Sequence, residues 1–213
     1  WHGAGGKKEI SIPQVYGGEE EWKAHYEYFR PYFMDKRYIK EENCPILLIY
    51  RLRNIPHFND RIRFWNECAK KDGFDGIFVV SMNICRENAG KSRWVNGEVD
   101  FEPNKSRAEI MQNPFFLQPK EEKSLFWNRY AVRSASYKKV NEKMLQTPHG
   151  KNQFRTVFVD FDDSPRRGIR AVITKGSTPG RFGKYLRKAI QKSKKEGNFY
   201  LFINAWNEWG EGN

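Results

Sequence analysis

The chain has 213 residues, and its 38 Lys and Arg against 26 Asp and Glu give a formal net charge of +12. Aromatic residues make up 15% of the chain, and no apolar run reaches the roughly 20 residues of a membrane span. The charge fits an anionic partner or a solvated basic surface. We favour the solvated surface, because the lysines concentrate on the outer faces of the predicted helices.

The cysteines and histidines argue against a disulfide framework and a metal centre. Three cysteines show no CxxC spacing, and four histidines form no HxxxH pair. The chain starts at Trp1 without a basic and apolar leader pattern. We therefore expect a cytoplasmic protein with reduced thiols, no metal and no cofactor.

The first third of the chain alternates between helical and strand patterns. Trp22, Tyr26 and Phe29 form one stripe of a helix expected over residues 19–30, which Pro31 should end. Residues 44–51 are a continuous apolar run, typical of a parallel strand buried on both faces.

A second helix and strand follow. Asn59 is the expected N-cap of a helix that ends at Gly73. Its apolar residues recur at helical spacing, namely Ile62, Trp65, Cys68 and Ala69. The next strand is predicted over residues 76–83.

The remainder continues the alternation. We predict strands over residues 99–102, 155–160 and 199–206, and a long amphipathic helix over 122–145. A further helix should be capped by Thr178, start at Pro179 and end at Gly197. Its apolar side is expected to carry Phe182, Leu186, Ala189 and Ile190. Five strands separated mostly by helices predict an α/β fold with a parallel sheet, either open or closed into a barrel.

The last predicted strand leads into a pair of glutamates. Strand alternation places Ile203 on one face, towards outer helices, and Asn204 and Glu208 on the other. If Gly210 lets the chain turn, the Cβ atoms of Glu208 and Glu211 would lie ~5–6 Å apart. Retaining glycosidases need two carboxyl groups ~5–5.5 Å apart.

The surroundings of this pair decide between two interpretations. A Glu-x-x-Glu pair alone is usually a strand end with two solvated glutamates. The inward Asn204 and the nearby Trp206 and Trp209 favour a catalytic pair. Burial and the neighbouring charge should raise the pKa of one carboxyl, which we expect to be Glu211.

The segment 204–212, Asn-Ala-Trp-Asn-Glu-Trp-Gly-Glu-Gly, resembles the closing signature of the glycosyltransferase WbsX family, which is related to glycoside hydrolase family 99, the endo-α-mannosidase type. Residues 161–166 read Phe-Asp-Asp-Ser-Pro-Arg where the family usually has Trp-Asp-Asn-Thr-Pro-Arg. Further segments match in order along the chain, at 14–17 with Trp22 and His25, then 33–39, 45–51, 101–103 and 176–179.

The resemblance implies an incomplete (β/α)₈ TIM-type barrel of about strands 4 to 8. Residues 1–213 would form a single domain that lacks the N-terminal strands of the barrel. The resemblance also implies a glycoside hydrolase or glycosyltransferase that acts on a polysaccharide or lipopolysaccharide-type glycan. Glu208 would be the base on the sugar 2-hydroxyl, giving a 1,2-anhydro sugar, and Glu211 the general acid/base.

Several residues are candidates for substrate binding. In the closing segment these are Asn204, Trp206, Asn207 and Trp209. Elsewhere they are Tyr50, Arg51, Glu102, Asp162 and Arg166. Structural roles compete at each of the latter positions: a barrel-rim ion pair at Tyr50 and Arg51, a salt bridge at Glu102, and a loop-fixing pair at Asp162 and Arg166. His25 is expected to be a packed histidine.

Three alternatives remain open. Asp160 and Asp162 form a DxD after a strand, which suits Mg²⁺ or Mn²⁺ in a nucleotide-sugar glycosyltransferase. A nucleic-acid-binding domain would fit the charge and the aromatics, but the basic residues lack the basic and aromatic alternation of such domains, so no nucleic-acid partner is expected. An inactive remnant is the third possibility.

Overall fold

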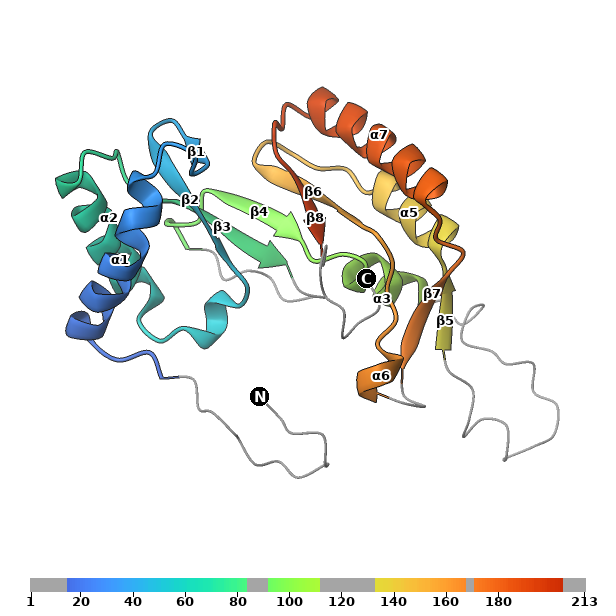
Figure 1. Ribbon diagram of the computed structural model, residues 1–213, viewed down its shortest axis with the longest axis horizontal. Helices are drawn as coiled ribbons and strands as arrows, with labels where there is room; N and C mark the ends of the chain where they lie inside the picture. The colour runs from blue at the N-terminus through green and yellow to red at the C-terminus, as the bar shows by residue number, and fades with distance from the viewer. Residues whose placement is uncertain (1–14, 84–91, 112–132, 168–170, 205–213) are drawn as a thin grey trace. The chain divides into compact units, whose positions relative to one another are not determined.

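The computed structural model describes residues 15–83, 92–111, 133–167 and 171–204, which form a mixed α/β fold (Figure 1). The chain divides into two compact units. The first comprises Trp1–Met82 and Glu87–Glu98, and the second Asn83–Arg86 and Val99–Asn213.

The first unit packs two helices against a short sheet. Its elements are α1 (Glu19–Met34), β1 (Lys40–Glu41), β2 (Cys44–Ile49), the 3₁₀ turn η1 (Leu52–Asn54), α2 (Phe58–Lys71) and β3 (Phe78–Asn83). β2 and β3 are parallel, with Ile46 opposite Phe78. β1 is an antiparallel addition joined to β2 by a turn whose two residues, Glu42 and Asn43, have positive φ.

Aromatic and aliphatic side chains of both helices form the core of this unit. Tyr26 and Phe33 of α1 pack with Ile62, Trp65 and Ala69 of α2, all of them buried. The Trp65 Nε1–H donates to the backbone carbonyl of Trp22 at 2.8 Å, which fixes the two helices to each other. The predicted apolar spacing of both helices is therefore confirmed.

Two predicted helix boundaries in this unit are wrong. α1 does not end before Pro31 but continues to Met34. Proline removes one helical hydrogen bond, but the fully buried Phe33 holds the last turn in the core. α2 is not capped by Asn59, because the His57 carbonyl accepts the first helical bond, from the Arg61 N–H at 3.0 Å.

The second unit is built around parallel strand pairs. Its elements are β4 (Gly97–Asp100, at the boundary of the units), α3 (Asn104–Met111), β5 (Arg133–Ser136), α5 (Tyr137–Gln146), β6 (Gln153–Phe158), α6 (Ser164–Arg167), β7 (Val172–Lys175), α7 (Pro179–Lys195) and β8 (Leu201–Asn204). β4 lies next to β6, and β6 is parallel to β8 with Phe158 opposite Asn204. β5 and β7 form a separate parallel pair.

Helices α5 and α7 lie side by side, and α7 packs against β6 and β8 (Figure 1). Tyr137 and Phe158 are completely buried in this core, and the Tyr137 hydroxyl donates to the Phe158 carbonyl at 3.0 Å. As predicted, Pro179 opens α7 and the Thr178 Oγ1 accepts from the Arg181 N–H. These contacts fix the helix that precedes β8.

Parts of the helical and strand predictions for the second unit fail. Residues 133–136 are not helical but form β5, because they pair with β7, and α5 begins only at Tyr137. The first part of the predicted helix, residues 122–132, lies outside the described residues. Ile190, predicted on the apolar side of α7, is 38% exposed, whereas Tyr185 and Ala189 are buried. Ile203, expected to face the outer helices, is 40% exposed.

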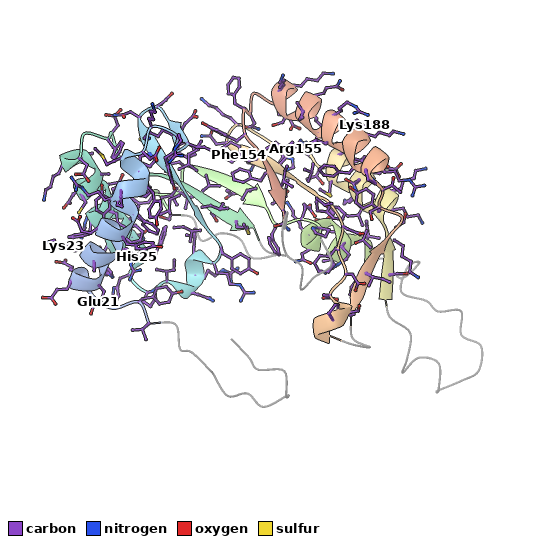
Figure 2. The ribbon with its side chains drawn as sticks, in the orientation of Figure 1. Glu21, Lys23, His25, Phe154, Arg155 and Lys188 are labelled. Carbon is purple, nitrogen blue, oxygen red and sulfur yellow. The ribbon has the colours of Figure 1, made fainter. Side chains whose placement is uncertain are left out.

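A buried ion pair holds the N-terminal end of β6. Arg155, labelled in Figure 2, donates to both carboxylate oxygens of Glu196 at 2.6 and 2.5 Å. It also donates to the backbone carbonyls of Met144 and Thr147, at the end of α5. One guanidinium thus joins β6 to the C-terminal ends of α5 and α7.

Candidate functional site

The C-terminal ends of β4 and β8 bring two predicted site residues together. The Asn204 side-chain amide, at the last residue of β8, donates to the backbone carbonyl of Glu102. The Thr156 hydroxyl of β6 donates to the Asp100 carbonyl at the end of β4, at 2.6 Å. These contacts place Asn204 and Glu102 at one strand edge of the second unit.

Glu102 is a buried carboxyl with an unusual titration. β4 ends at Asp100, so Glu102 does not lie in a strand as predicted but caps the start of α3. Its Oε2 accepts from the Ser106 N–H at 2.9 Å and its Oε1 from the Ser106 hydroxyl at 2.6 Å. Burial raises the pKa of Glu102 to about 7, although the hydrogen bonds from Ser106 act in the opposite direction.

Because both Glu102 oxygens are occupied by Ser106, its side chain has a structural role in this geometry. The predicted salt bridge at Glu102 is not present among the ion pairs of the described residues. A carboxyl with a pKa near neutrality is also suited to proton transfer. A contact between Glu102 and substrate remains a prediction.

A charged cluster beside Glu102 was not found from the sequence. Asp100 Oδ2 lies 3.0 Å from His149 Nε2, and the Lys105 Nζ donates to Asp100 Oδ1 at 2.7 Å. Burial alone would raise the pKa of Asp100, but the hydrogen bonds from His149 and Lys105 outweigh it and lower that pKa. No sequence spacing indicated that His149 would meet Asp100, because the two are far apart in the chain.

The acidic residues after β6 organise their own loop. The Asp160 Oδ2 accepts from the Ser177 hydroxyl at 2.5 Å and its Oδ1 from the Phe161 N–H at 2.8 Å. The Asp162 Oδ1 accepts from the Ser164 N–H at 2.8 Å. In the part of the chain that the structure describes, no group of three or more His, Cys, Asp or Glu could hold a metal ion.

The first unit contains a separate pocket of about 220 Å³ between α1, α2 and the end of β2. Its walls combine aliphatic side chains of β2 with aromatic ones, Tyr16, His25, Tyr50 and Trp65 among them, and Arg61 also lines it. Tyr50 is a predicted substrate residue and is 47% exposed. The guanidinium of Arg51, the neighbouring candidate, lies 5.2 Å from the Tyr50 ring centre, so the two form a cation–π contact and not an ion pair.

The His25 ring packs against two aromatic side chains, as expected, but the residue as a whole is exposed. It projects from α1 (Figure 2), with its ring centre 4.5 Å from that of Phe29 and 5.2 Å from that of Trp65. Burial lowers the pKa of His25, and the charge of Arg61 lowers it further. Both effects favour the neutral form of the ring.

The remaining predicted site residues lie outside the described part of the chain. These are Trp206, Asn207, Glu208, Trp209 and Glu211, and the side chain of Arg166. The separation and protonation of the two glutamates therefore stay predictions. Among the described helices, none has the length and apolar character that a membrane crossing requires.

The mixed α/β fold is shared with a solved structure called a glycoside hydrolase-like protein. The similarity has a TM-score of 0.51 at 10% sequence identity, and covers 90% of this chain and 52% of that protein. At this identity the likeness concerns the fold.

The sequence comparison gives the family. The chain belongs to the glycosyltransferase WbsX family, whose family model matches residues 1–213. This membership places it in a family of carbohydrate-active enzymes. An uncharacterized protein WxcX of Xanthomonas campestris pv. campestris strain B100 is 22% identical over the whole chain, and its counterpart in a second strain is 21% identical. The chain spans about 30% of the length of these relatives.

Proposed function

We propose that this chain is part of an enzyme that acts on glycosidic bonds of a polysaccharide or lipopolysaccharide-type glycan through two carboxylates, Glu208 and Glu211. Family membership over the whole chain supports the substrate class. The observation that carries the site is Asn204, which ends β8 and is bonded to the Glu102 carbonyl, four residues before Glu208. Strand ends of this kind are where barrel enzymes assemble their chemistry.

The proposed scaffold is an incomplete (β/α)₈ barrel in which residues 1–213 form one domain with about strands 4 to 8. The parallel pairs β2–β3 and β6–β8 support it, as do α2 between β2 and β3 and α7 before β8. The remaining strands would come from the part of the protein that this chain does not cover.

In the proposed mechanism, Glu208 removes the proton of the sugar 2-hydroxyl and the freed oxygen attacks C1. The glycosidic bond breaks as Glu211 donates its proton to the departing oxygen, which leaves a 1,2-anhydro sugar. A hydroxyl of water or of a glycan then attacks C1 and gives its proton to Glu211. The epoxide C1–O2 bond opens, and O2 regains its proton from Glu208.

Each half of this sequence inverts C1, so the overall reaction retains the anomeric configuration. Glu211 must carry a proton at the start, which requires a raised pKa. We propose that Trp206 and Trp209 keep water away from it, and that Asn204 and Asn207 hold the sugar hydroxyls. Tyr50, Arg51, Glu102, Asp162 and Arg166 are proposed contacts to more distant parts of the substrate.

The first test is the stereochemistry of the product. The complete protein would be incubated with a panel of α- and β-glycosyl fluorides, and the first-formed product followed by proton NMR. Retention at C1 with loss of turnover in Glu208→Gln is the expected result. Inversion would exclude the mechanism, and undiminished turnover in Glu208→Gln would exclude Glu208 as the base.

A further inference from the structure

Arg61 is a buried cation without a counter-ion in the described part of the chain. It is 5% exposed, and no Asp or Glu of the described residues forms an ion pair with it. Its Nη2 donates to the Tyr16 carbonyl, while its Nε is buried and has no hydrogen-bond partner. At least one donor of the guanidinium is therefore unused within the described structure.

Aromatic rings surround this guanidinium. Its central carbon lies 5.5 Å from the ring centre of Tyr16, 5.4 Å from that of Trp22 and 5.7 Å from that of Trp65. Cation–π contacts offset part of the desolvation of a buried charge, but they satisfy no N–H donor. Burial consequently lowers the pKa of Arg61. A bound anion beside the guanidinium would supply the missing negative charge.

The pocket that Arg61 lines suits one sugar ring. Its volume of about 220 Å³ lies below the roughly 300–1,000 Å³ of pockets for drug-sized ligands. Tyr50 is half-exposed and His25 is also exposed, whereas Trp65 is buried. Aromatic faces pack against the C–H side of a sugar ring, while a guanidinium fork matches the two oxygens of a carboxylate or phosphate.

We propose that this pocket binds an acidic sugar, with the anionic group on Arg61 and the ring against the aromatic wall that includes Tyr50. The choice of a sugar as the ligand rests on the proposed action on glycans. The inference adds that the glycan carries a negative charge, as a carboxylate or a phosphate. This pocket lies in the first unit and uses none of the proposed catalytic residues.

The test is direct binding by isothermal titration calorimetry to the complete protein. The probes are methyl β-glucuronide, glucose 6-phosphate and the neutral methyl β-glucoside. At least one acidic probe should bind about tenfold or more tightly than the glucoside, in line with the worth of a charge-assisted pair. The better acidic probe identifies the anionic group. Equal affinity for all three, or no binding of either acidic probe, would overturn the proposal.

Two variants connect the preference to the pocket. Arg61→Met keeps most of the side-chain volume and should remove the preference for the acidic probes. Tyr50→Ala should lower the affinity for every probe that binds. A preference that survives Arg61→Met would mean that another site reads the charge. If Arg61→Met does not fold, the ring signal of His25 in the wild-type protein still tests the site. That signal should shift with the acidic probe, because the His25 ring lines the pocket, and an unshifted signal at saturation would refute the site.

Binding and catalysis can fail separately. Glu208→Gln should bind the acidic probe as tightly as the wild-type protein, because the measurement needs no turnover. Loss of turnover with unchanged binding supports both proposals. If Glu208→Gln keeps both its turnover and its preference for the acidic probe, the proposed sugar pocket still stands. Only the catalytic role of Glu208 is then excluded.

Discussion

The Asn204 side-chain amide donates a hydrogen bond to the backbone carbonyl of Glu102, joining the end of β8 to the segment that follows β4. The Glu102 side chain meanwhile caps α3 through Ser106. Asn204 lies four residues before Glu208, and the residue that accepts its hydrogen bond has a buried carboxyl. The position of Asn204, next to the proposed active site, therefore depends on how α3 packs.

Replacing Asn204 by Asp should destabilise the protein and reduce turnover. The change is nearly isosteric, but it removes the donor and places a carboxylate against the Glu102 carbonyl. A lost buried partner costs roughly 1–3 kcal/mol, and thermal unfolding would measure it. The exposed neighbour Ile203 provides the control, since Ile203→Val should change neither property. A stable and fully active Asn204→Asp protein would contradict the proposed role of this bond.

Glu102→Gln should change how stability depends on pH. The folded-state pKa of about 7 lies above the ordinary 4.5, so the folded protein resists ionisation of Glu102. The associated stability is fully present below pH 4.5 and is lost as the pH rises through 7. The stability that is lost over this pH range amounts to roughly 3 kcal/mol.

The glutamine variant cannot ionise and can keep both contacts to Ser106. Its free energy of unfolding, measured by urea titrations between pH 4 and pH 8, should therefore increase relative to that of the wild-type protein as the pH rises. Glu109→Gln, at an exposed position of the same helix, is the control and should follow the wild-type curve. Parallel curves for Glu102→Gln and the wild-type protein would show that folding does not raise the pKa of Glu102.

Arg155→Met should be one of the most destabilising changes in the second unit. It leaves Glu196 without its partner and frees the carbonyls of Met144 and Thr147. Breaking a buried ion pair by removing one partner costs about 3–5 kcal/mol. Denaturant unfolding of the two single variants and of the double variant with Glu196→Gln would isolate the coupling between the pair.

A surface ion pair provides the comparison for Arg155. Lys138 and Glu142 lie 3.8 Å apart on the exposed side of α5. Exposed pairs contribute little to stability, so Lys138→Met should leave the unfolding midpoint nearly unchanged. Equal losses at Lys138 and Arg155 would mean that burial does not determine the strength of the Arg155 contact.

The sequence predicts those elements whose own residues contain the signal. Thr178 and Pro179 predict the start of α7. The spacing of Ile62, Trp65 and Ala69 predicts α2. Both predictions succeed because caps and apolar periodicity are local properties of the sequence. The strand β5 was missed since four residues form a strand only through pairing with β7, which is a tertiary effect.

The candidate sites divide in the same way. The two glutamates stand out from a motif, and Tyr50 from its position at the end of an apolar run. The contact of Asp100 with His149, and those of Arg61 with three aromatic rings, join distant parts of the chain. Composition shows many cations, but only the packing shows that Arg61 is buried without a carboxylate partner among the described residues.

The final prediction separates the roles of Glu208 and Glu211 by the chemistry of the leaving group. Glu211→Gln cannot donate a proton, so turnover of a glycoside with a poor leaving group should fall about 10²–10⁴-fold. The fluoride ion leaves a glycosyl fluoride without needing a proton. The same variant should therefore recover much of the rate on that substrate. Glu208→Gln should be impaired on both substrates, because the 2-hydroxyl must still lose its proton. Initial rates of the complete protein on the two substrates would give the ratio for each variant. Equal loss on both substrates in Glu211→Gln would remove Glu211 as the acid, and recovery in Glu208→Gln instead would exchange the two roles.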